Sequence, residues 1–418
     1  MNTPEYYGYK LGENIAPYIN KCIDVTGECY ISEGTHILGR NDNNWHSGNI
    51  WIDNSIIWGW NKKHNVKIIG AGRDKTTLKW IDDCQASRLF DKPCDVMTMV
   101  STNWNESCND NLIKDITFDG NYNFNRNSAT MIAIRIRGEG NKVEGCRFIN
   151  LAAGTKDSHE CFQIVIGPID KNGRGTEILN NHFTLPGRKS FSTKNPVPEN
   201  TLIAVGGVDT KIIGNIIEDM DFNVVDQQSP LHAITISNTK NAVISDNKFL
   251  NFQGSCIYMD SWSNEDCLIA DNVAKNVYQF LHLSCQHWDN SDQISFNKNF
   301  KVINNEVELY VGNCYYHWDK PPFVSNFIGY TNAPNVDHTK YPGFENVVVT
   351  NNIVKLGYRS ISGKTFEEST KLFCFWGSNV TDDKIKLTAN FFSSSIPKPE
   401  KSPSFWRKII IFFKNLFK

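Results

Sequence analysis

The sequence predicts an all-β protein, a right-handed parallel β-helix with a short capping helix at its start and an amphipathic helix at its end. One short pattern recurs along the chain: an apolar residue, two of any type, Asn, one of any type, and an apolar residue. Each recurrence is followed by a second run in which apolar and polar residues alternate, as in strands. No amphipathic helix of useful length separates the runs, which argues against alternating strand–helix units.

One asparagine marks each repeat, in segments such as KIIGNIIED (211–219) and AVISDNKFL (242–250). Successive Asn residues stand 25 to 47 residues apart, and insertions of variable length are what a stacked solenoid tolerates. An Asn at the same turn of every coil can hydrogen-bond the Asn above and below it, so we expect a ladder. The column, with Cys146 in its first place, is Asn181, Asn215, Asn247, Asn272, Asn305, Asn352 and Asn390.

The two ends of the chain differ from the repeats. Residues 11–22, LGENIAPYINKC, have the pattern of a short amphipathic helix, which would cover the open edge of the first coil. A Ser, Pro and Lys-rich stretch without periodicity precedes the last fifteen residues. The predicted segments are a cap (1–22), a parallel β-helix (23–395), a linker (396–403) and an amphipathic helix (404–418).

Composition excludes several classes of protein. The net charge is -2 and no basic block lies outside the tail, so we expect no nucleic-acid partner. The 12 cysteines lack metal-ligand spacing, so no metal and no cofactor is expected. Neither a secretory signal nor an apolar run long enough to cross a bilayer is present. We therefore expect reduced, buried thiols in a cytoplasmic protein, with disulfides as the alternative.

Three early segments, GECYISEGTHILG, NVKIIGAGRDKTTLKW and DITFDGN, follow one another as in the pectate-lyase-like superfamily. The resemblance covers roughly residues 10–395 and implies a right-handed parallel β-helix. It does not choose a chemistry, because the superfamily holds polysaccharide lyases, glycoside hydrolases, epimerases, phage tailspikes and non-catalytic members.

The alternating runs predict a strip of outward side chains on one sheet. The side chains at the centre of the strip are small and those at its ends are polar. The longest insertions, at 154–160, 186–200 and 221–230, flank it. A small floor with polar ends and long side loops predicts a groove that holds a glycan. The outward positions, coil by coil, are Arg135 and Arg137, Gln163 and Val165, Ala204 and Gly206, Thr235 and Ser237, Tyr258 and Asp260, and His282 and Ser284.

Within the strip, Asp260 and His282 fall on adjacent coils, where a carboxylate and an imidazole can carry out general acid–base catalysis. Glu160 and Asp226, on the flanking loops, can supply the second carboxylate that glycoside hydrolysis needs. The alternative is that Asp260 is a solvated surface residue and that His282 hydrogen-bonds a loop.

The remaining strip residues suit sugar binding. A guanidinium neutralises a uronate or another acidic sugar, and aromatic rings stack on sugar rings. In the alternative, the arginines cover an early coil and the aromatic residues pack loops. The predicted substrate-binding residues are Arg135, Arg137, Gln163, Thr235, Tyr258, Trp262 and His232.

The tail, SFWRKIIIFFKNLFK, has two faces on a helical wheel: its polar residues are cationic or Asn415, and its apolar residues except Ile411 lie opposite them. A helix of this length is roughly 22 Å long, too short for a bilayer core of about 30 Å. It should lie in the interface of an anionic membrane, or else cap the last coil. The predicted membrane-binding residues are Trp406, Arg407, Lys408, Phe412, Phe413 and Lys414.

Together these features favour a membrane-associated, carbohydrate-active protein on the inner face of the membrane. Its expected partner is a polysaccharide or lipid-linked glycan, in the biosynthesis or modification of a cell-surface polysaccharide such as a capsule or O-antigen. The alternatives are a tailspike-like depolymerase (a lyase or a glycoside hydrolase) and a non-catalytic glycan-binding scaffold. The sequence has no lyase motif and no Asp-Asp signature of the polygalacturonase type, so the reaction stays open.

Overall fold

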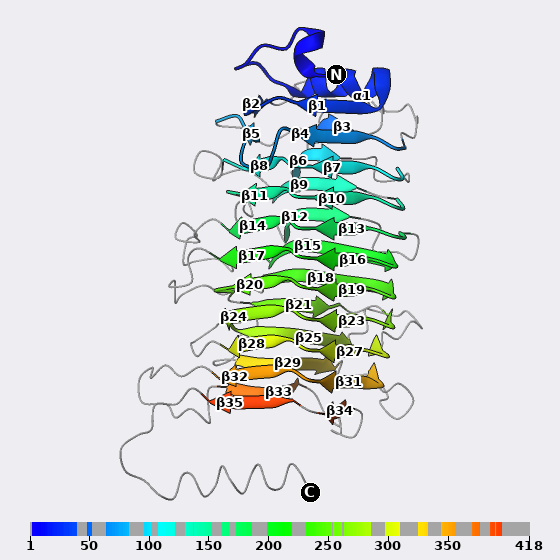
Figure 1. Cartoon of the computed structure of the whole chain (residues 1–418), viewed down its shortest axis with the longest axis vertical. Helices are drawn as coiled ribbons and strands as arrows, with labels where there is room; N and C mark the ends of the chain where they lie inside the picture. Colours follow the sequence, from blue (N-terminus) through cyan, green and yellow to red (C-terminus); the bar gives the residue numbers. More distant parts are fainter. Residues whose placement is uncertain are drawn as a thin grey trace, which may run out of the picture.

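The protein is a parallel β-helix in which each coil supplies one strand to each of three sheets (Figure 1). This is the architecture that the repeat predicts. The computed structural model describes residues 2–39, 48–51, 64–82, 96–101, 108–121, 130–136, 138–151, 160–166, 173–185, 199–219, 231–252, 254–260, 263–285, 297–309, 325–332, 344–356, 370–376, 385–388 and 390–394.

The first and second sheets are joined by short turns within each coil, and all recorded strand pairs are parallel. The first sheet holds β1 (Glu28–Ile31), β4 (Lys67–Gly70), β7 (Leu112–Lys114), β10 (Lys142–Glu144), β13 (Glu177–Leu179), β16 (Lys211–Ile213), β19 (Val243–Ser245), β23 (Leu268–Ala270), β27 (Lys301–Ile303), β31 (Val347–Thr350) and β34 (Ile385–Thr388). The second sheet holds β2 (Gly34–Leu38), β5 (Thr76–Trp80), β8 (Thr117–Asp119), β11 (Arg147–Ile149), β14 (His182–Leu185), β17 (Ile216–Asp219), β20 (Lys248–Leu250), β24 (Val273–Val277), β28 (Glu306–Leu309), β32 (Ile353–Leu356) and β35 (Phe391–Ser394).

The third sheet has the longest strands, and it contains the alternating runs noted in the sequence. Its main path holds β3 (Gly48–Trp51), β6 (Val96–Ser101), β9 (Thr130–Ile136), β12 (Glu160–Ile166), β15 (Glu199–Val208), β18 (Leu231–Lys240), β21 (Ser255–Met259), β25 (Gln279–Cys285), β29 (Ser325–Asn332) and β33 (Thr370–Trp376). Three short strands branch from the end of β18, where Lys240 pairs with Glu265: β22 (Asn264–Glu265), β26 (Asn297–Lys298) and β30 (Phe344–Glu345).

The predicted asparagine ladder is confirmed. From Asn181 to Asn390, each side-chain Nδ2 donates to the Oδ1 of the next Asn in the column, at 2.8 to 3.1 Å. Cys146 holds the first place through its backbone, whose N–H donates to Asn181 Oδ1 at 2.9 Å. The residue before each ladder position from Cys146 to Asn352 is Asn, Asp or Gly with positive φ, as Asn180 and Gly214 illustrate, because the tight turn between the first two sheets needs a left-handed residue.

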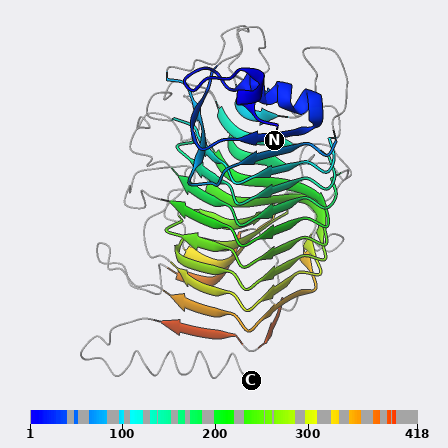
Figure 2. The ribbon, with the colours of Figure 1, turned by 45° about the horizontal axis from the view of Figure 1, so that its top comes forward.

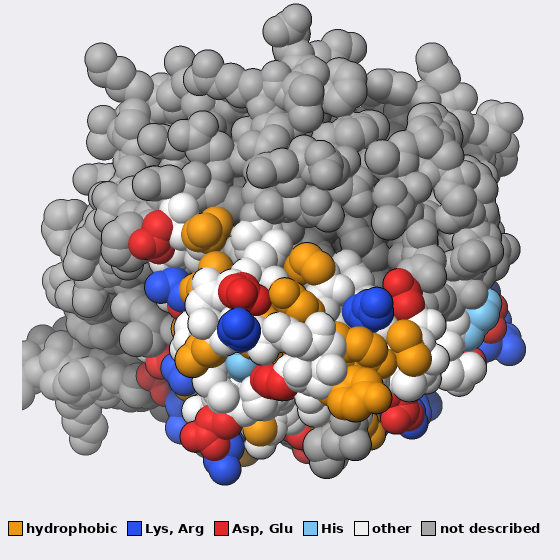
Figure 3. All heavy atoms as spheres, turned by 90° about the horizontal axis from the view of Figure 1, so that it is seen from above, with side chains coloured by type: hydrophobic (Ala, Val, Ile, Leu, Met, Phe, Trp, Pro, Cys, Tyr) orange, Lys and Arg blue, Asp and Glu red, His pale blue; other side chains and the backbone are white. Residues whose placement is uncertain are grey.

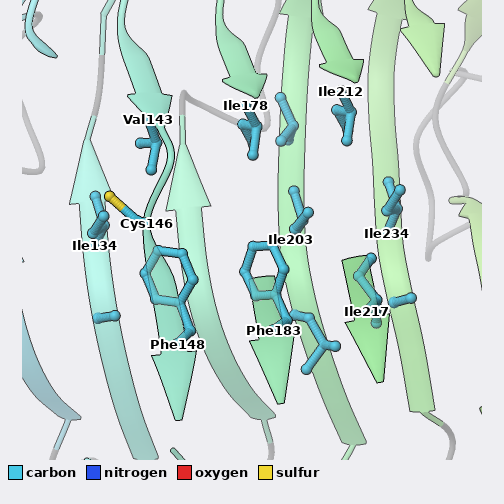
Figure 4. Packing of buried hydrophobic residues seen from close by; sticks show 14 of the residues in the cluster. Ile134, Val143, Cys146, Phe148, Ile178, Phe183, Ile203, Ile212, Ile217 and Ile234 are labelled. Atoms are coloured by element: carbon cyan, nitrogen blue, oxygen red, sulfur yellow. The ribbon is translucent and has the colours of Figure 1, made fainter. Parts of the chain in front are cut away.

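Apolar side chains from the three sheets fill the coils in stacked layers (Figure 4). The ring of Phe148 stacks on that of Phe183, with centroids 4.7 Å apart and planes 14° apart. Val143, Ile178 and Ile212 repeat one position on the first sheet and are fully buried. Each coil therefore buries its apolar residues against like residues of its neighbours.

At the N-terminal end, the 3-10 helix η1 (Pro4–Tyr7) and the helix α1 (Ala16–Thr26) pack beside the first coil (Figures 1 and 2). The helix expected over 11–22 thus begins at Ala16 and extends to Thr26, where Gly27 ends it with a φ of 76°. Its buried residues join the core, and the end of the molecule presents charged, polar and apolar side chains together (Figure 3).

The linker and the C-terminal segment 404–418 lie outside the described residues. Within the described part of the chain, no helix is both long enough and apolar enough to cross a membrane. Among the cysteines with described side chains, Cys22, Cys29, Cys146, Cys256 and Cys267 are free and buried, and Cys108 is buried.

Candidate functional site

The register of the third sheet aligns one row of residues across seven successive coils. Because parallel pairing repeats the same position in each coil, side chains in this row follow one another at about 4.8 Å. The row brings together four of the predicted site residues. It runs Arg135, Val165, Ala204, Thr235, Tyr258, His282 and Gly329.

Strict alternation, which the sequence analysis assumed, fails in the middle of these strands. On several strands whose side chains the structure describes, two consecutive residues, such as Ala233 and Ile234 or Phe280 and Leu281, are fully buried in the core. The strand must bend to place both inside. As a result, residues three apart come to lie on the same outer side, and the polar side chain of Gln279 contacts that of His282.

The register also places two positions of β12. Val165 pairs with both Arg135 and Ala204 and so occupies the row, while the side chain of Gln163 lies outside the described residues. Glu160 is not a loop residue: it begins β12 and pairs with Glu199 in the next coil. For both positions the register, which depends on the neighbouring coils, decides the placement.

A polar network lies beside the row. Gln279 Oε1 accepts hydrogen bonds from Ser255 Oγ at 2.5 Å and from His282 Nδ1 at 3.0 Å, while Gln279 Nε2 donates to Asn326 Oδ1 at 2.9 Å. These residues are all almost completely buried. Because the amide oxygen accepts from Nδ1, the imidazole carries its proton on Nδ1 and leaves Nε2 unprotonated.

The environment of His282 suits a neutral ring. Burial, with a smaller contribution from His232, lowers the pKa of His282 to about 3. An imidazole with this pKa is uncharged at neutral pH, so it has no second proton to donate as an acid and is a weak base. It can still accept a hydrogen bond through Nε2.

Tyr258 is enclosed by two histidines. His232 stacks on its ring with centroids 4.1 Å apart and planes 13° apart, and His282 meets it edge-on at 5.0 Å. The side chain is 9% exposed. His232 therefore covers one face of the Tyr258 ring. The sequence had suggested instead an open ring on which a sugar could stack.

Asp260 directly follows β21, two residues after Tyr258, which is the row residue of that strand and pairs with His282. Its backbone N–H donates to Ile236 O at 2.8 Å, and its Oδ2 accepts from Ser237 Oγ at 3.1 Å. Asn264 Nδ2 donates to its carbonyl oxygen at 3.1 Å. The residue is half-buried, so a carboxylate held in place by its neighbours remains accessible.

Arg135 provides the positive charge of the row. Burial lowers its pKa to about 10, which leaves the guanidinium charged at neutral pH. Arg135, Thr235 and Asp260 are half-buried, whereas Tyr258 and His282 are buried. The strip is thus not the continuous open surface that alternation predicted: it offers a few accessible polar groups above a buried polar layer.

Other predicted site residues cannot be placed in this arrangement. Arg137, Asp226 and Trp262 lie outside the described residues, as do the membrane-binding residues of the tail. The flanking insertions lie outside them too, apart from their last residues in β12 and β15. Among the described residues, no three or more His, Cys, Asp and Glu side chains gather as metal ligands would.

Sequence reasoning missed Ser255, Gln279 and Asn326. A signal for them exists, because a polar residue stands three positions before each row residue on five successive strands. The pairs are Thr201 and Ala204, His232 and Thr235, Ser255 and Tyr258, Gln279 and His282, and Asn326 and Gly329.

No family model and no curated protein sequence matches the chain. Solved structures do resemble it. A tailspike double mutant of E. coli bacteriophage HK620 has a TM-score of 0.64 at 13% identity, over 94% of this chain and 61% of that chain. A mutant of the same tailspike in complex with pentasaccharide has a TM-score of 0.63 at 14% identity, with the same coverage. PfbA, a surface adhesin of Streptococcus pneumoniae, has a TM-score of 0.52 at 13% identity, over 94% of this chain and 90% of that chain.

This chain therefore spans 61% of the tailspike's length, and at such low identity the likeness concerns the fold alone. It agrees with the resemblance seen in the early segments of the sequence. The chain is a right-handed parallel β-helix protein.

Proposed function

We propose that this protein is carbohydrate-active and binds an acidic polysaccharide along the outer face of the third sheet. The observation that carries the proposal is the register of Arg135, Thr235, Tyr258 and His282 in one row. With about 4.8 Å between coils, the row from Arg135 to His282 extends for roughly 24 Å. That length suits several sugar units rather than one.

The accessible groups of this face match the chemistry of a glycan. Arg135 keeps its charge at neutral pH, and a guanidinium binds a carboxylate with two parallel hydrogen bonds. Thr235 can donate to and accept from sugar hydroxyls, and the carboxylate of Asp260 can accept from them. His282, neutral and protonated on Nδ1, is suited to accept a hydrogen bond rather than to transfer a proton.

If the protein is an enzyme, Asp260 is a better candidate for proton transfer than His282. Its side chain is half-buried, and carboxyl groups can act as general bases or acids. Glu160 and Asp226 remain candidates for the second carboxylate. Known structures support the fold, and mutants of the HK620 tailspike, which has that fold, are solved in complex with pentasaccharide.

The proposal extends to the place of action. The cationic, two-faced segment 404–418 holds the protein on the inner face of an anionic membrane, and the substrate is a lipid-linked glycan of a cell-surface polysaccharide such as a capsule or O-antigen. The sequence pattern of the tail supports this extension.

A binding experiment tests the glycan face. The full chain is titrated with polygalacturonate and with neutral dextran, and Arg135→Gln is compared with Lys67→Gln. Lys67 is a matched control, because it is a 45% exposed cation on the first sheet, paired with Glu28. We expect polygalacturonate to bind more tightly than dextran, and Arg135→Gln to weaken its binding at least tenfold, the scale of one charge-assisted hydrogen-bonded pair.

If Arg135→Gln and Lys67→Gln bind polygalacturonate equally well, the glycan does not bind to this face. A wild-type chain that binds neither polymer would contradict the proposal as a whole. If the wild-type chain cleaves or converts a polysaccharide, Asp260→Asn should lower turnover at least a hundredfold. Cleavage of a polymer in solution would favour the depolymerase alternative, and binding without turnover would favour the scaffold.

A further inference from the structure

A second cluster of polar groups lies on the outer face of the second sheet. Arg147 on β11 pairs in register with His182 on β14, and both alternate with the buried residues Phe148 and Phe183. Their side chains therefore project outward from neighbouring coils, about 4.8 Å apart. His182 has 24% of its side chain exposed and Arg147 has 40%, so both are accessible to a solute.

A second cation reaches this place from a distant coil. Arg73 lies in the turn between β4 and β5, and its carbonyl oxygen accepts a hydrogen bond from Thr117 Oγ1. Its Nη1 donates to Asn180 O at 3.3 Å, two residues before His182. The turn thus carries a guanidinium to the start of β14, beside the imidazole.

The donors of this cluster are not used up by the neighbouring acids. Arg147 Nε is buried, with no hydrogen-bond acceptor among the described residues. The Oδ1 of Asp74, whose side chain is 74% exposed, is 3.8 Å from Arg147 Nη1, and Glu218 Oε2 is 3.7 Å from His182 Nε2. Both distances exceed a hydrogen bond, so these carboxylates neutralise the cluster weakly.

The pKa of the His182 imidazole depends on the charged groups around it. Burial first, and then the guanidinium groups of Arg147 and Arg73, lower the pKa of His182, while Glu218 acts in the opposite direction. Two cations beside a ring that is held neutral create a place where a negative charge is favourable.

We propose that Arg73, Arg147 and His182 form an oxyanion-binding site on the outer face of the second sheet. The ligand group is a carboxylate or a phosphate, which the planar fork of a guanidinium binds with two hydrogen bonds. The site lies on a different sheet from the proposed glycan face, and its argument does not depend on that function.

Isothermal titration of the full chain tests the site, with inorganic phosphate and glucuronate as separate probes. Arg147→Gln is compared with Arg174→Gln, an arginine 66% exposed beside Asp209 that lies outside the cluster. Arg73→Gln removes the second guanidinium from a half-exposed turn without touching the core. We expect saturable binding of at least one probe, weakened at least tenfold in Arg147→Gln and Arg73→Gln and unchanged in Arg174→Gln.

The two probes separate the sources of the oxyanion: preference for glucuronate indicates a sugar acid, and preference for phosphate indicates a phosphoryl group. Absence of saturable binding of both probes to the wild-type chain, or equal weakening in Arg174→Gln, would overturn the proposal.

A second readout follows the imidazole itself. The pKa of His182, measured by NMR with His182→Gln used to assign its signal, should rise when the preferred probe saturates the site, since a bound anion favours the protonated ring. The groups that face the ring are Arg73 and Arg147, which lower its pKa, and Glu218, which raises it. An unchanged pKa at saturation would place the anion elsewhere.

Discussion

Replacing Asn247 by leucine should destabilise the middle of the solenoid. Its Oδ1 accepts from the backbone N–H of Asn215 at 3.0 Å and from Asn215 Nδ2 at 2.9 Å. Its Nδ2 donates to Ile212 O at 2.8 Å and to Asn272 Oδ1 at 3.0 Å. The side chain is fully buried, so leucine would remove four hydrogen bonds from a place that water does not reach.

The cost can be worked out from the groups that lose a partner. Asn215 Nδ2 keeps Ile178 O, and Asn272 Oδ1 keeps the N–H of Asn247. The Asn215 N–H loses its recorded acceptor, and Ile212 O loses a donor. A buried polar group left unpaired costs about 1–3 kcal/mol, so two such groups cost about 2–6 kcal/mol.

Lys248→Leu is the matched control, because it places the same side chain one residue on, at an exposed position, where the change should stay within about 0.5 kcal/mol. Solenoids need not unfold in one step, so a local measurement is required. Amide hydrogen exchange over 211–219 and 242–250, read by mass spectrometry, reports the local free energy of opening. Equal protection in the two variants would refute the reasoning that the ladder amides are mutually dependent.

Three further outcomes are expected. Burial lowers the pKa of His282 to about 3, against 6.5 for an ordinary histidine, so the unfolded chain takes up a proton first as pH falls. The wild type should therefore lose roughly 1.4 kcal/mol per pH unit below 6.5 relative to His282→Gln, in urea unfolding between pH 7 and 4.5. Gly207→Ala should lower the thermal midpoint more than Gly8→Ala: both have a φ near 97°, but a Cβ at Gly207 would collide with the carbonyl of Gly173, whereas nothing lies near Gly8. Deleting 404–418 should abolish co-sedimentation with anionic vesicles at low salt and leave the far-UV spectrum of the β-helix unchanged; full-length chain that stays in the supernatant contradicts membrane binding.

The fold could be predicted because its signals are local and repeated. A buried ladder amide needs an amide partner in each neighbouring coil, so the Asn of every repeat is specified at the same turn. The residue before it needs positive φ, which Asn, Asp and Gly adopt most easily. The two requirements appear together in the sequence at most repeats, as at Asn180 and Asn181, and Asn181 to Asn390 could be aligned before any coordinates were known.

The candidate site could be predicted in part. Arg135, Thr235, Tyr258 and His282 share a row, as the alternating runs suggested, because parallel strands repeat one position. The alternating run offered both Gln163 and Val165 for the coil of β12, and the register with the neighbouring coils places Val165 in the row.

The sequence by itself determined the repeating unit, its buried ladder and the sheet that carries the outward polar row. Tertiary structure alone decided which of those polar groups are covered: His282 is neutral because the folded chain buries it, and no local pattern encodes that burial. It also decided the oxyanion cluster, in which Arg73 contacts Asn180, 107 residues away. Coils stack in space regardless of the length of chain between them, so a contact across several coils leaves no periodic signal in the sequence.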